Sequence, residues 1–356
     1  MDPRWRQLGS LLVNWSAQVK PGEKVMIAMG ELDSFPLARG VHEAVIRAGG
    51  YPQIQFLSET LRHQILKHGS EEQLSRVPDI EAFGMEWADV YIGLRGASNL
   101  HEHDDIPAAR LAQNQKAIGV VSTMRWQKTR WCLVRVPNAA FAQQAGTDEE
   151  TITEMFFNAC LLDWEAESAT WREWALRLDK GKRVRVTGKG TDLSFSVEGR
   201  TWQPADGRIN IPDGEIMTAP VEGSMDGEIH FDLPGVLSGR LVHDIRLRFE
   251  KGRLVKATSS TNQDFLTNVL ATDPGASVVG EFAMGTNMAV DRFCNDILID
   301  EKIGGTVHLA MGRSYPECGG RNKSAIHWDI VKDIRREGSV LVDGVAVLEK
   351  GSFLLP

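Results

Sequence analysis

The segment AIHWDI, residues 325–330, places a histidine and an aspartate two positions apart within an apolar run. The run is typical of a β-strand, in which successive side chains point to opposite faces. His327 and Asp329 therefore share one face, and the bulky apolar side chains occupy the other. An imidazole and a carboxylate on one strand face are groups that can bind a metal ion or exchange a proton.

Three other strand-like segments carry similar polar residues. Glu215 lies in IPDGEIMTAP, Glu281 in SVVGEFAMGTN and His308 in GGTVHLAMG. Each residue alone is more often a surface carboxylate or a hydrogen-bonded structural histidine. Burying all of them unpaired would be costly, because desolvation penalises every ion. Metal ions compensate for such a set, and mixed carboxylate and imidazole ligands favour zinc, cobalt or manganese over calcium.

The charges of these residues predict hydrolytic chemistry. Glu215, Glu281 and Asp329 bring three negative charges. Two divalent cations would leave the site at about +1, which favours a bound hydroxide, and would also polarise a carbonyl group.

The elements that must position these side chains follow from the pattern of apolar residues. Strand patterns cover 22–30, 51–57, 88–96 and 115–123, with a helical pattern over 32–50. Strands that alternate with helices predict an α/β N-terminal domain with a mainly parallel sheet.

A long helical pattern covers 148–181, with an acidic start and a Gly-terminated end. From Lys182 the apolar residues alternate at period 2, with a Gly-rich turn at 188–190, as in antiparallel hairpins. We therefore predict a β-rich α+β catalytic C-terminal domain, and we place the two domains at residues 1–180 and 181–356.

Composition narrows the class of protein. The 356 residues are 42% hydrophobic and 25% charged, with a net charge of −8 and dispersed basic residues, so we expect no nucleic-acid partner. No apolar run reaches the length of a membrane span, and the four cysteines are widely spaced, so we expect free thiols and a cytoplasmic protein. The segment HEHDD, 101–105, could suggest a metal clip through His101 and His103, but its polarity favours a solvated loop.

In their order and spacing, these segments resemble the metallo-aminopeptidase family typified by aminopeptidase T and aminopeptidase S. The resemblance rests on NIPDGEIMTAP, GEFAMGTN and DEKIGGTVHLAMGRSYPECGGRNKSAIHWDI, and it covers the second predicted domain better than the first. It implies two divalent metal ions, a homodimer, and removal of N-terminal residues from short peptides; a related amide that carries an amine next to the scissile bond stays open as the substrate. The metal ligands that it implies are Glu215, Glu281, His308, Tyr315, His327 and Asp329.

We expect further catalytic roles in the same segments. Glu281 or Asp329 would bridge the two ions, and Tyr315 would either bind metal or donate to the developing oxyanion. Glu301 is a candidate base or a partner of a ligand, and Lys302 a candidate contact to a carbonyl or carboxylate group.

Two other functions stay open. His308, His327 and Asp329 alone form a 2-His-1-carboxylate set, as in a non-haem Fe(II) ring-cleaving dioxygenase of the dihydroxypyridine type, a distant relative of that family. The retained Glu215 and Glu281 favour the hydrolase. The chain could also be a non-catalytic relative that keeps the metals for stability.

Overall fold

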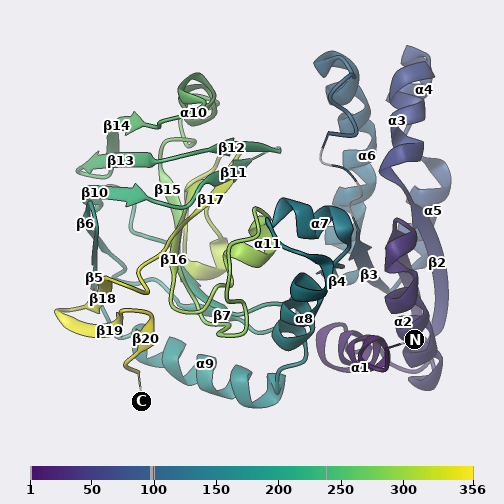
Figure 1. Cartoon of the computed structure of the whole chain (residues 1–356), viewed down its shortest axis with the longest axis horizontal. Helices are drawn as coiled ribbons and strands as arrows, with labels where there is room; N and C mark the ends of the chain where they lie inside the picture. Colours follow the sequence, from purple (N-terminus) through teal and green to yellow (C-terminus); the bar gives the residue numbers. More distant parts are fainter. Residues whose placement is uncertain (1, 97–98, 100, 238, 356) are drawn as a thin grey trace. The chain divides into compact units, whose positions relative to one another are not determined.

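The computed structural model describes residues 2–96, 99, 101–237 and 239–355 (Figure 1). These residues form two compact units. The first runs to Leu161 and includes Gly207–Pro212, and the second consists of Leu162–Asp206 and of the chain from Asp213 onward. The domain boundary expected between residues 180 and 181 stays a prediction, because compactness is not a test of independent folding.

The first unit is built on a parallel five-stranded sheet in the order β2-β1-β3-β4-β8. Its central strands are apolar and buried, since helices accompany them as expected for βαβ connections. The α/β fold with a parallel sheet that the sequence predicted is confirmed. The strands are β1 (Lys24–Gly30), β2 (Tyr51–Leu57), β3 (Val90–Arg95), β4 (Arg130–Arg135) and β8 (Asn210–Ile211). The helices are α1 (Arg4–Leu11), η1 (Leu12–Ser16), η2 (Leu32–Ser34), α2 (Phe35–Arg47), α3 (Glu59–His68), α4 (Glu71–Ser75), α5 (Asp79–Trp87), α6 (Ala108–Lys128), α7 (Ala139–Gln144) and α8 (Glu149–Cys160).

The last strand of this sheet, β8, comes from a distant part of the chain. It pairs with β4 through Leu133 opposite Asn210 and Val134 opposite Ile211. The chain therefore leaves the first unit after Leu161, returns to complete its sheet, and leaves again at Asp213.

The strand predicted over 115–123 is wrong. These residues lie within α6, a helix of 21 residues. The β-branched and apolar residues of the segment resemble a strand, but the buried residues Asn114, Ala117 and Val121 recur at helical spacing. The sheet instead takes β4, which follows immediately after this helix.

The helix predicted over 148–181 is two helices, α8 and α9 (Trp164–Leu178). Asp163 separates them, because its side chain accepts a hydrogen bond from the backbone N–H of Ala166 at 3.2 Å and so begins a new helix.

Among the described residues, the second unit contains two large antiparallel sheets and the two-stranded antiparallel sheet β11-β12, so the β-rich prediction is confirmed. An eight-stranded sheet has the order β14-β13-β10-β6-β5-β18-β19-β20, and a five-stranded sheet the order β17-β16-β15-β9-β7. Phe282 of β15 contacts Phe195 of β6 with ring centroids 5.1 Å apart, so the apolar face of the smaller sheet packs on the larger one. The larger sheet comprises β5 (Arg183–Gly188), β6 (Thr191–Ser196), β10 (Asp226–Phe231), β13 (Ile245–Glu250), β14 (Arg253–Thr258), β18 (Gly338–Val342), β19 (Val345–Glu349) and β20 (Ser352–Phe353). The smaller sheet comprises β7 (Gln203–Ala205), β9 (Glu215–Thr218), β15 (Val279–Gly285), β16 (Val307–Gly312) and β17 (His327–Lys332). The other elements are α9, β11 (Gly235–Leu237), β12 (Arg240–Val242), α10 (Gln263–Leu270), α11 (Ile297–Asp300) and η3 (Pro316–Cys318).

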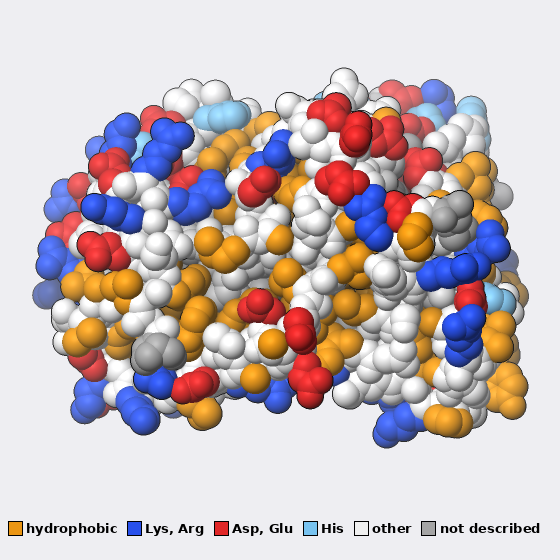
Figure 2. Space-filling view, turned by 60° about the horizontal axis from the view of Figure 1, so that its bottom comes forward, with side chains coloured by type: hydrophobic (Ala, Val, Ile, Leu, Met, Phe, Trp, Pro, Cys, Tyr) orange, Lys and Arg blue, Asp and Glu red, His pale blue; other side chains and the backbone are white. Residues whose placement is uncertain are grey.

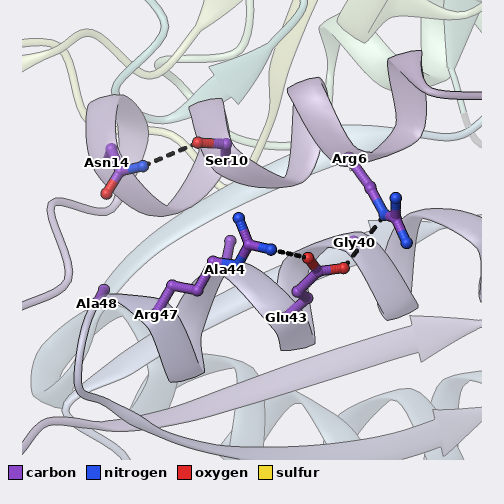
Figure 3. A pocket seen from close by; sticks show the side chains of 8 residues that line it. All are labelled: Arg6, Ser10, Asn14, Gly40, Glu43, Ala44, Arg47 and Ala48. Carbon is purple, nitrogen blue, oxygen red and sulfur yellow. Dashed lines mark hydrogen bonds and ion pairs between the residues drawn. The ribbon is translucent and has the colours of Figure 1, made fainter.

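One face of the molecule carries charged side chains of both signs. Acidic and basic side chains lie interspersed on the face shown in Figure 2. A hollow of about 410 Å³ lies beside α1 and α2, where Glu43 pairs with Arg6 and Arg47 (Figure 3). Among the described helices, none is long and apolar enough to cross a membrane.

Candidate metal centre

The register of the smaller sheet brings the predicted polar residues onto one face. Glu281 lies opposite Ala310, and Ala310 lies opposite Asp329, so the three side chains point the same way. His308 and His327 are each two residues from a member of this row and therefore share its face.

Glu215 joins the same face from the other side of β15. It pairs with Gly285, which is four residues beyond Glu281 on that strand. Ala283 lies opposite His308, so small side chains occupy the positions between the ionisable groups and leave room for a ligand.

Gly285 also allows a second segment to approach the site. A Cβ atom on Gly285 would lie 2.2 Å from the carbonyl oxygen of Ile303 and 3.1 Å from that of Glu301. The absence of a side chain at this position therefore lets residues 301–303 pack against the end of β15. This contact brings Glu301 and Lys302 beside Glu215.

The first of two ligand groups consists of Glu215, Glu301 and His308, whose donor atoms lie within 4.8 Å of one another. Nε2 of His308 is 3.2 Å from Oε2 of Glu215. Lys302 is buried beside this group, with Nζ 2.5 Å from Oε1 of Glu215, 2.9 Å from Oε1 of Glu301 and 3.1 Å from Oδ1 of Asp213.

The second group consists of Glu281, His327 and Asp329, again within 4.8 Å. Nε2 of His327 is 3.2 Å from Oε2 of Glu281 and 3.4 Å from Oδ1 of Asp329. The other oxygen of Glu281, Oε1, lies 3.6 Å from Nε2 of His308. Glu281 therefore faces both groups, one with each oxygen.

The orientation of His327 is fixed from outside the site. Its Nδ1 lies 2.7 Å from the carbonyl oxygen of Arg313, which can only accept, so Nδ1 carries a proton and donates. This bond directs Nε2 toward Glu281 and Asp329, as the outer hydrogen bond of a metal-ligating histidine usually does.

Several buried atoms of the site have no hydrogen-bond partner. They are Oε2 of Glu215, Oδ1 of Asp329 and both ring nitrogens of His308. Buried polar atoms are rarely left unsatisfied, because each carries a desolvation cost. Carboxylate oxygens and imidazole nitrogens that converge without hydrogen-bond partners are suitable ligands for divalent metal ions of the zinc, cobalt or manganese type.

Burial and mutual contact shift the pKa values of these groups strongly. Burial would raise the pKa of Glu215, but the neighbouring Lys302 and His308 lower it to about 2. Burial raises the pKa of Glu301 to about 8, despite Lys302. Burial would lower the pKa of His327, but Asp329 and Glu281 raise it to about 11. The shifts show that opposite charges are concentrated in a volume that excludes water.

Tyr315 lies at the rim of this cluster. It follows β16, and its ring is 5.0 Å from the ring of His327 in an edge-on arrangement. Burial, together with the charges of Glu281 and Asp329, raises the pKa of its hydroxyl group, so the group keeps its proton and can donate.

The structure also places Asp213, which our sequence analysis did not name, and Asn322 close to the site. Asp213 is buried and contacts Lys302, although its segment PDG resembles an ordinary turn. Asn322 holds the loop that carries Tyr315, because its side chain donates to the carbonyl oxygens of Gly275 and Gly312.

The histidines of HEHDD do not join the site. His101 pairs with Asp104 at 2.8 Å, and His103 pairs with Glu59 at 2.7 Å. Among the described residues, the groups able to hold a metal ion are the two above.

Two adjacent carboxylate and imidazole groups on a buried sheet face are the arrangement of a metal-dependent enzyme. Residues 1–353 match the family described as Thermophilic metalloprotease (M29), and the chain belongs to this family.

Curated relatives bear the names of aminopeptidases. Aminopeptidase 2 of Geobacillus stearothermophilus is 24% identical over 358 residues, which cover 88% of this chain and 85% of the relative. Aminopeptidase T of Thermus thermophilus is 26% identical over 348 residues, which cover 87% of this chain and 85% of the relative. The predicted family and the predicted class of enzyme, a metal-dependent aminopeptidase, are confirmed.

Solved structures show the same fold. Wild-type AmpT from Thermus thermophilus superposes with a TM-score of 0.87 at 23% identity over 99% of both chains. A 2,5-dihydroxypyridine dioxygenase from Pseudomonas putida KT2440 superposes with a TM-score of 0.64 at 14% identity, covering 99% of this chain and 97% of the dioxygenase.

Proposed function

We propose that the chain cleaves N-terminal residues from short peptides with two divalent metal ions. One ion would be held by the group around Glu215 and His308, and the other by the group around His327 and Asp329. The observation that carries this proposal is Glu281, whose two oxygens face one histidine of each group. When bound, such ions supply a hydroxide near neutral pH and polarise the scissile carbonyl.

The residues of the chain would divide the remaining work. Glu281 spans the two groups and holds them at a fixed separation. Glu301 contacts Lys302 within the first group. A bound cation beside it would favour its ionised form, so Glu301 would take a proton from the attacking water and return it to the leaving amine. Tyr315, protonated and beside His327, donates a hydrogen bond to the oxyanion of the tetrahedral intermediate.

The dioxygenase alternative is less well supported by this geometry. It needs His308, His327 and Asp329 around one iron ion. His308 instead lies with Glu215 and Glu301, while His327 and Asp329 lie with Glu281. The likeness to the dioxygenase, at 14% identity, extends to the fold alone.

Metal analysis together with a Glu281→Gln variant tests the proposal. The wild type should bind two divalent ions per chain and hydrolyse aminoacyl arylamides. Glu281→Gln should keep its fold by circular dichroism and lose at least about a thousandfold in kcat/KM, since the site would lose the carboxylate that faces both groups. Glu228→Gln, at an exposed position of β10, is the matched control and should keep full activity.

One iron per chain with oxygen consumption on a dihydroxypyridine would overturn the hydrolase proposal. Two bound ions without hydrolysis of any aminoacyl substrate would favour a non-catalytic relative.

We also propose that the protein is a cytoplasmic homodimer. Its four buried free thiols are compatible with a reducing compartment, and analytical ultracentrifugation would test the dimer.

A further inference from the structure

Lys302 is a fully buried lysine at the edge of the proposed metal centre. Its ammonium group has three protons and three carboxylate partners, on Asp213, Glu215 and Glu301, at 2.5 to 3.1 Å. A buried ammonium that is surrounded in this way cannot move into solvent without breaking all three contacts, so its charge is a permanent part of the site.

The ammonium occupies one oxygen of each carboxylate that the first metal group would use. It contacts Oε1 of Glu215 and Oε1 of Glu301, which leaves Oε2 of Glu215 without a hydrogen bond, at 3.2 Å from Nε2 of His308. Lys302 and a divalent ion are therefore directed at the same two side chains.

Among the described residues, no lysine or arginine contacts the second group, and Lys302 acts on Asp329 only from a longer distance. The charged contacts of Glu281, His327 and Asp329 are to one another and to His308. A cation in the first group would lie beside the Lys302 ammonium, whereas a cation in the second group would not contact it. The two affinities for a cation should therefore differ, because like charges repel strongly in a site that excludes water.

We propose that Lys302 makes the two metal positions unequal: the group of Glu281, His327 and Asp329 fills first, and the group of Glu215, Glu301 and His308 fills second and more weakly. This inference rests on the proposed two-ion function. Lys302 acts as a positioning residue, since it restricts Glu215 and Glu301 to one free oxygen each and opposes the second cation.

A calorimetric titration of the metal-free protein with Co²⁺ measures the affinities of the two positions. The wild type should show a tight step and a weak step. The weak step should vanish in His308→Ala and the tight step in His327→Ala, which assigns each step to its group.

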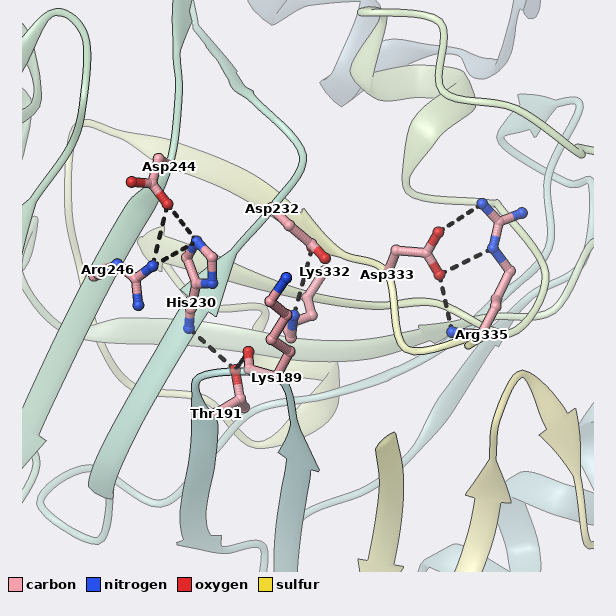
Figure 4. A network of polar contacts seen from close by, with 9 residues as sticks. All are labelled: Lys189, Thr191, His230, Asp232, Asp244, Arg246, Lys332, Asp333 and Arg335. Carbon is pink, nitrogen blue, oxygen red and sulfur yellow. Dashed lines mark hydrogen bonds and ion pairs between the residues drawn. The ribbon is translucent and has the colours of Figure 1, made fainter. Parts of the chain in front are cut away.

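Lys302→Met then tests the cause of the difference. With the ammonium removed, the weak step should tighten by at least about tenfold, while the tight step stays within about threefold. Lys332→Met is the matched control, since Lys332 is also fully buried. Among the charged residues drawn in Figure 4, its ammonium group contacts only Asp232, with Nζ 3.4 Å from Oδ1. It should leave both steps unchanged.

Asp213→Asn should change the affinity of the weak step in the opposite direction, and it leaves the buried lysine in place. It preserves the shape of the side chain but removes one negative charge beside Lys302, so the weak step should weaken further. A purely structural role for this cluster would instead weaken metal binding in both Lys302→Met and Asp213→Asn.

The inference is overturned if Lys302→Met weakens or preserves the weak step, if Asp213→Asn tightens it, or if His308→Ala removes the tight step. These outcomes differ from failure of the proposed function. That function fails if the wild type binds fewer than two ions or shows no aminopeptidase activity, whatever the variants do.

Discussion

Tyr315 and Glu281 show how far single residues define the chemistry of the site. Glu281 contributes geometry, because its two oxygens face His308 and His327. Tyr315 would contribute a proton, because burial and the neighbouring carboxylates raise the pKa of its hydroxyl group. We propose that this donor serves the oxyanion; as a metal ligand Tyr315 would instead be a phenolate.

Tyr315→Phe separates these two roles. If the hydroxyl group donates to the oxyanion, kcat should fall by about 100- to 1,000-fold while the metal content stays at the wild-type value. Steady-state kinetics and metal analysis on the same preparation check both quantities. Tyr51→Phe, at a position that is 63% exposed, is the matched control and should change neither. Loss of a metal ion in Tyr315→Phe would assign the residue as a ligand instead.

At the scale of elements, the antiparallel sheet aligns the candidate ligands on its strands, and a close contact at Gly285 brings Glu301 and Lys302 to them. β9, β15, β16 and β17 present their polar residues on one face by register alone. Glu301 and Lys302 come from the segment after α11 and reach the sheet only because Gly285 has no side chain.

Gly285→Ala tests this contact. The new methyl group would meet the carbonyl oxygen of Ile303 at 2.2 Å, so the 301–303 segment must shift. We expect a loss of about 1–3 kcal/mol in the free energy of unfolding and weaker binding of one metal ion. Gly119→Ala in α6 is the control, because its Cβ meets nothing within 4 Å and alanine favours a helix. Unchanged metal binding in Gly285→Ala would show that Glu301 does not need this contact.

The elements also show what sequence patterns can predict. The strands that carry the candidate ligands were predictable, because each combines period-2 alternation with an ionisable residue, and the motifs around them are specific. Asp213 was not, since a buried partner of a lysine is indistinguishable from a turn residue until the fold brings Lys302 to it. The segment 115–123 was assigned to a strand because local β-propensity was strong, whereas packing against the sheet favoured the helix.

At the scale of the molecule, the site concentrates negative charge that the fold must tolerate. Asp213, Glu215, Glu281 and Asp329 are all buried, and Lys302 is buried among them with Glu301 beside it. Bound divalent ions would neutralise this charge in the folded state only, so they should stabilise the protein.

Removal of metal should therefore lower the Tm of the second unit. At a free metal concentration a thousand times Kd, each ion contributes about 4 kcal/mol to the free energy of unfolding. Thermal unfolding with and without EDTA, followed by addition of Co²⁺, checks the effect and its reversal. The Tm of Glu281→Gln should fall less on addition of EDTA than the Tm of the wild type. An equal fall in both proteins would show that Glu281 does not contribute to metal binding.

The return of the chain through β8 bears on the order of events during synthesis. A ribosome releases β1 to β4 long before residues 210 and 211, so the outer edge of β4 stays unpaired while about 75 further residues emerge. An unpaired apolar edge invites pairing with other chains. The sheet of the first unit therefore stays incomplete until residues 207–212 have emerged, and a fragment cut at residue 180 would lack β8 permanently.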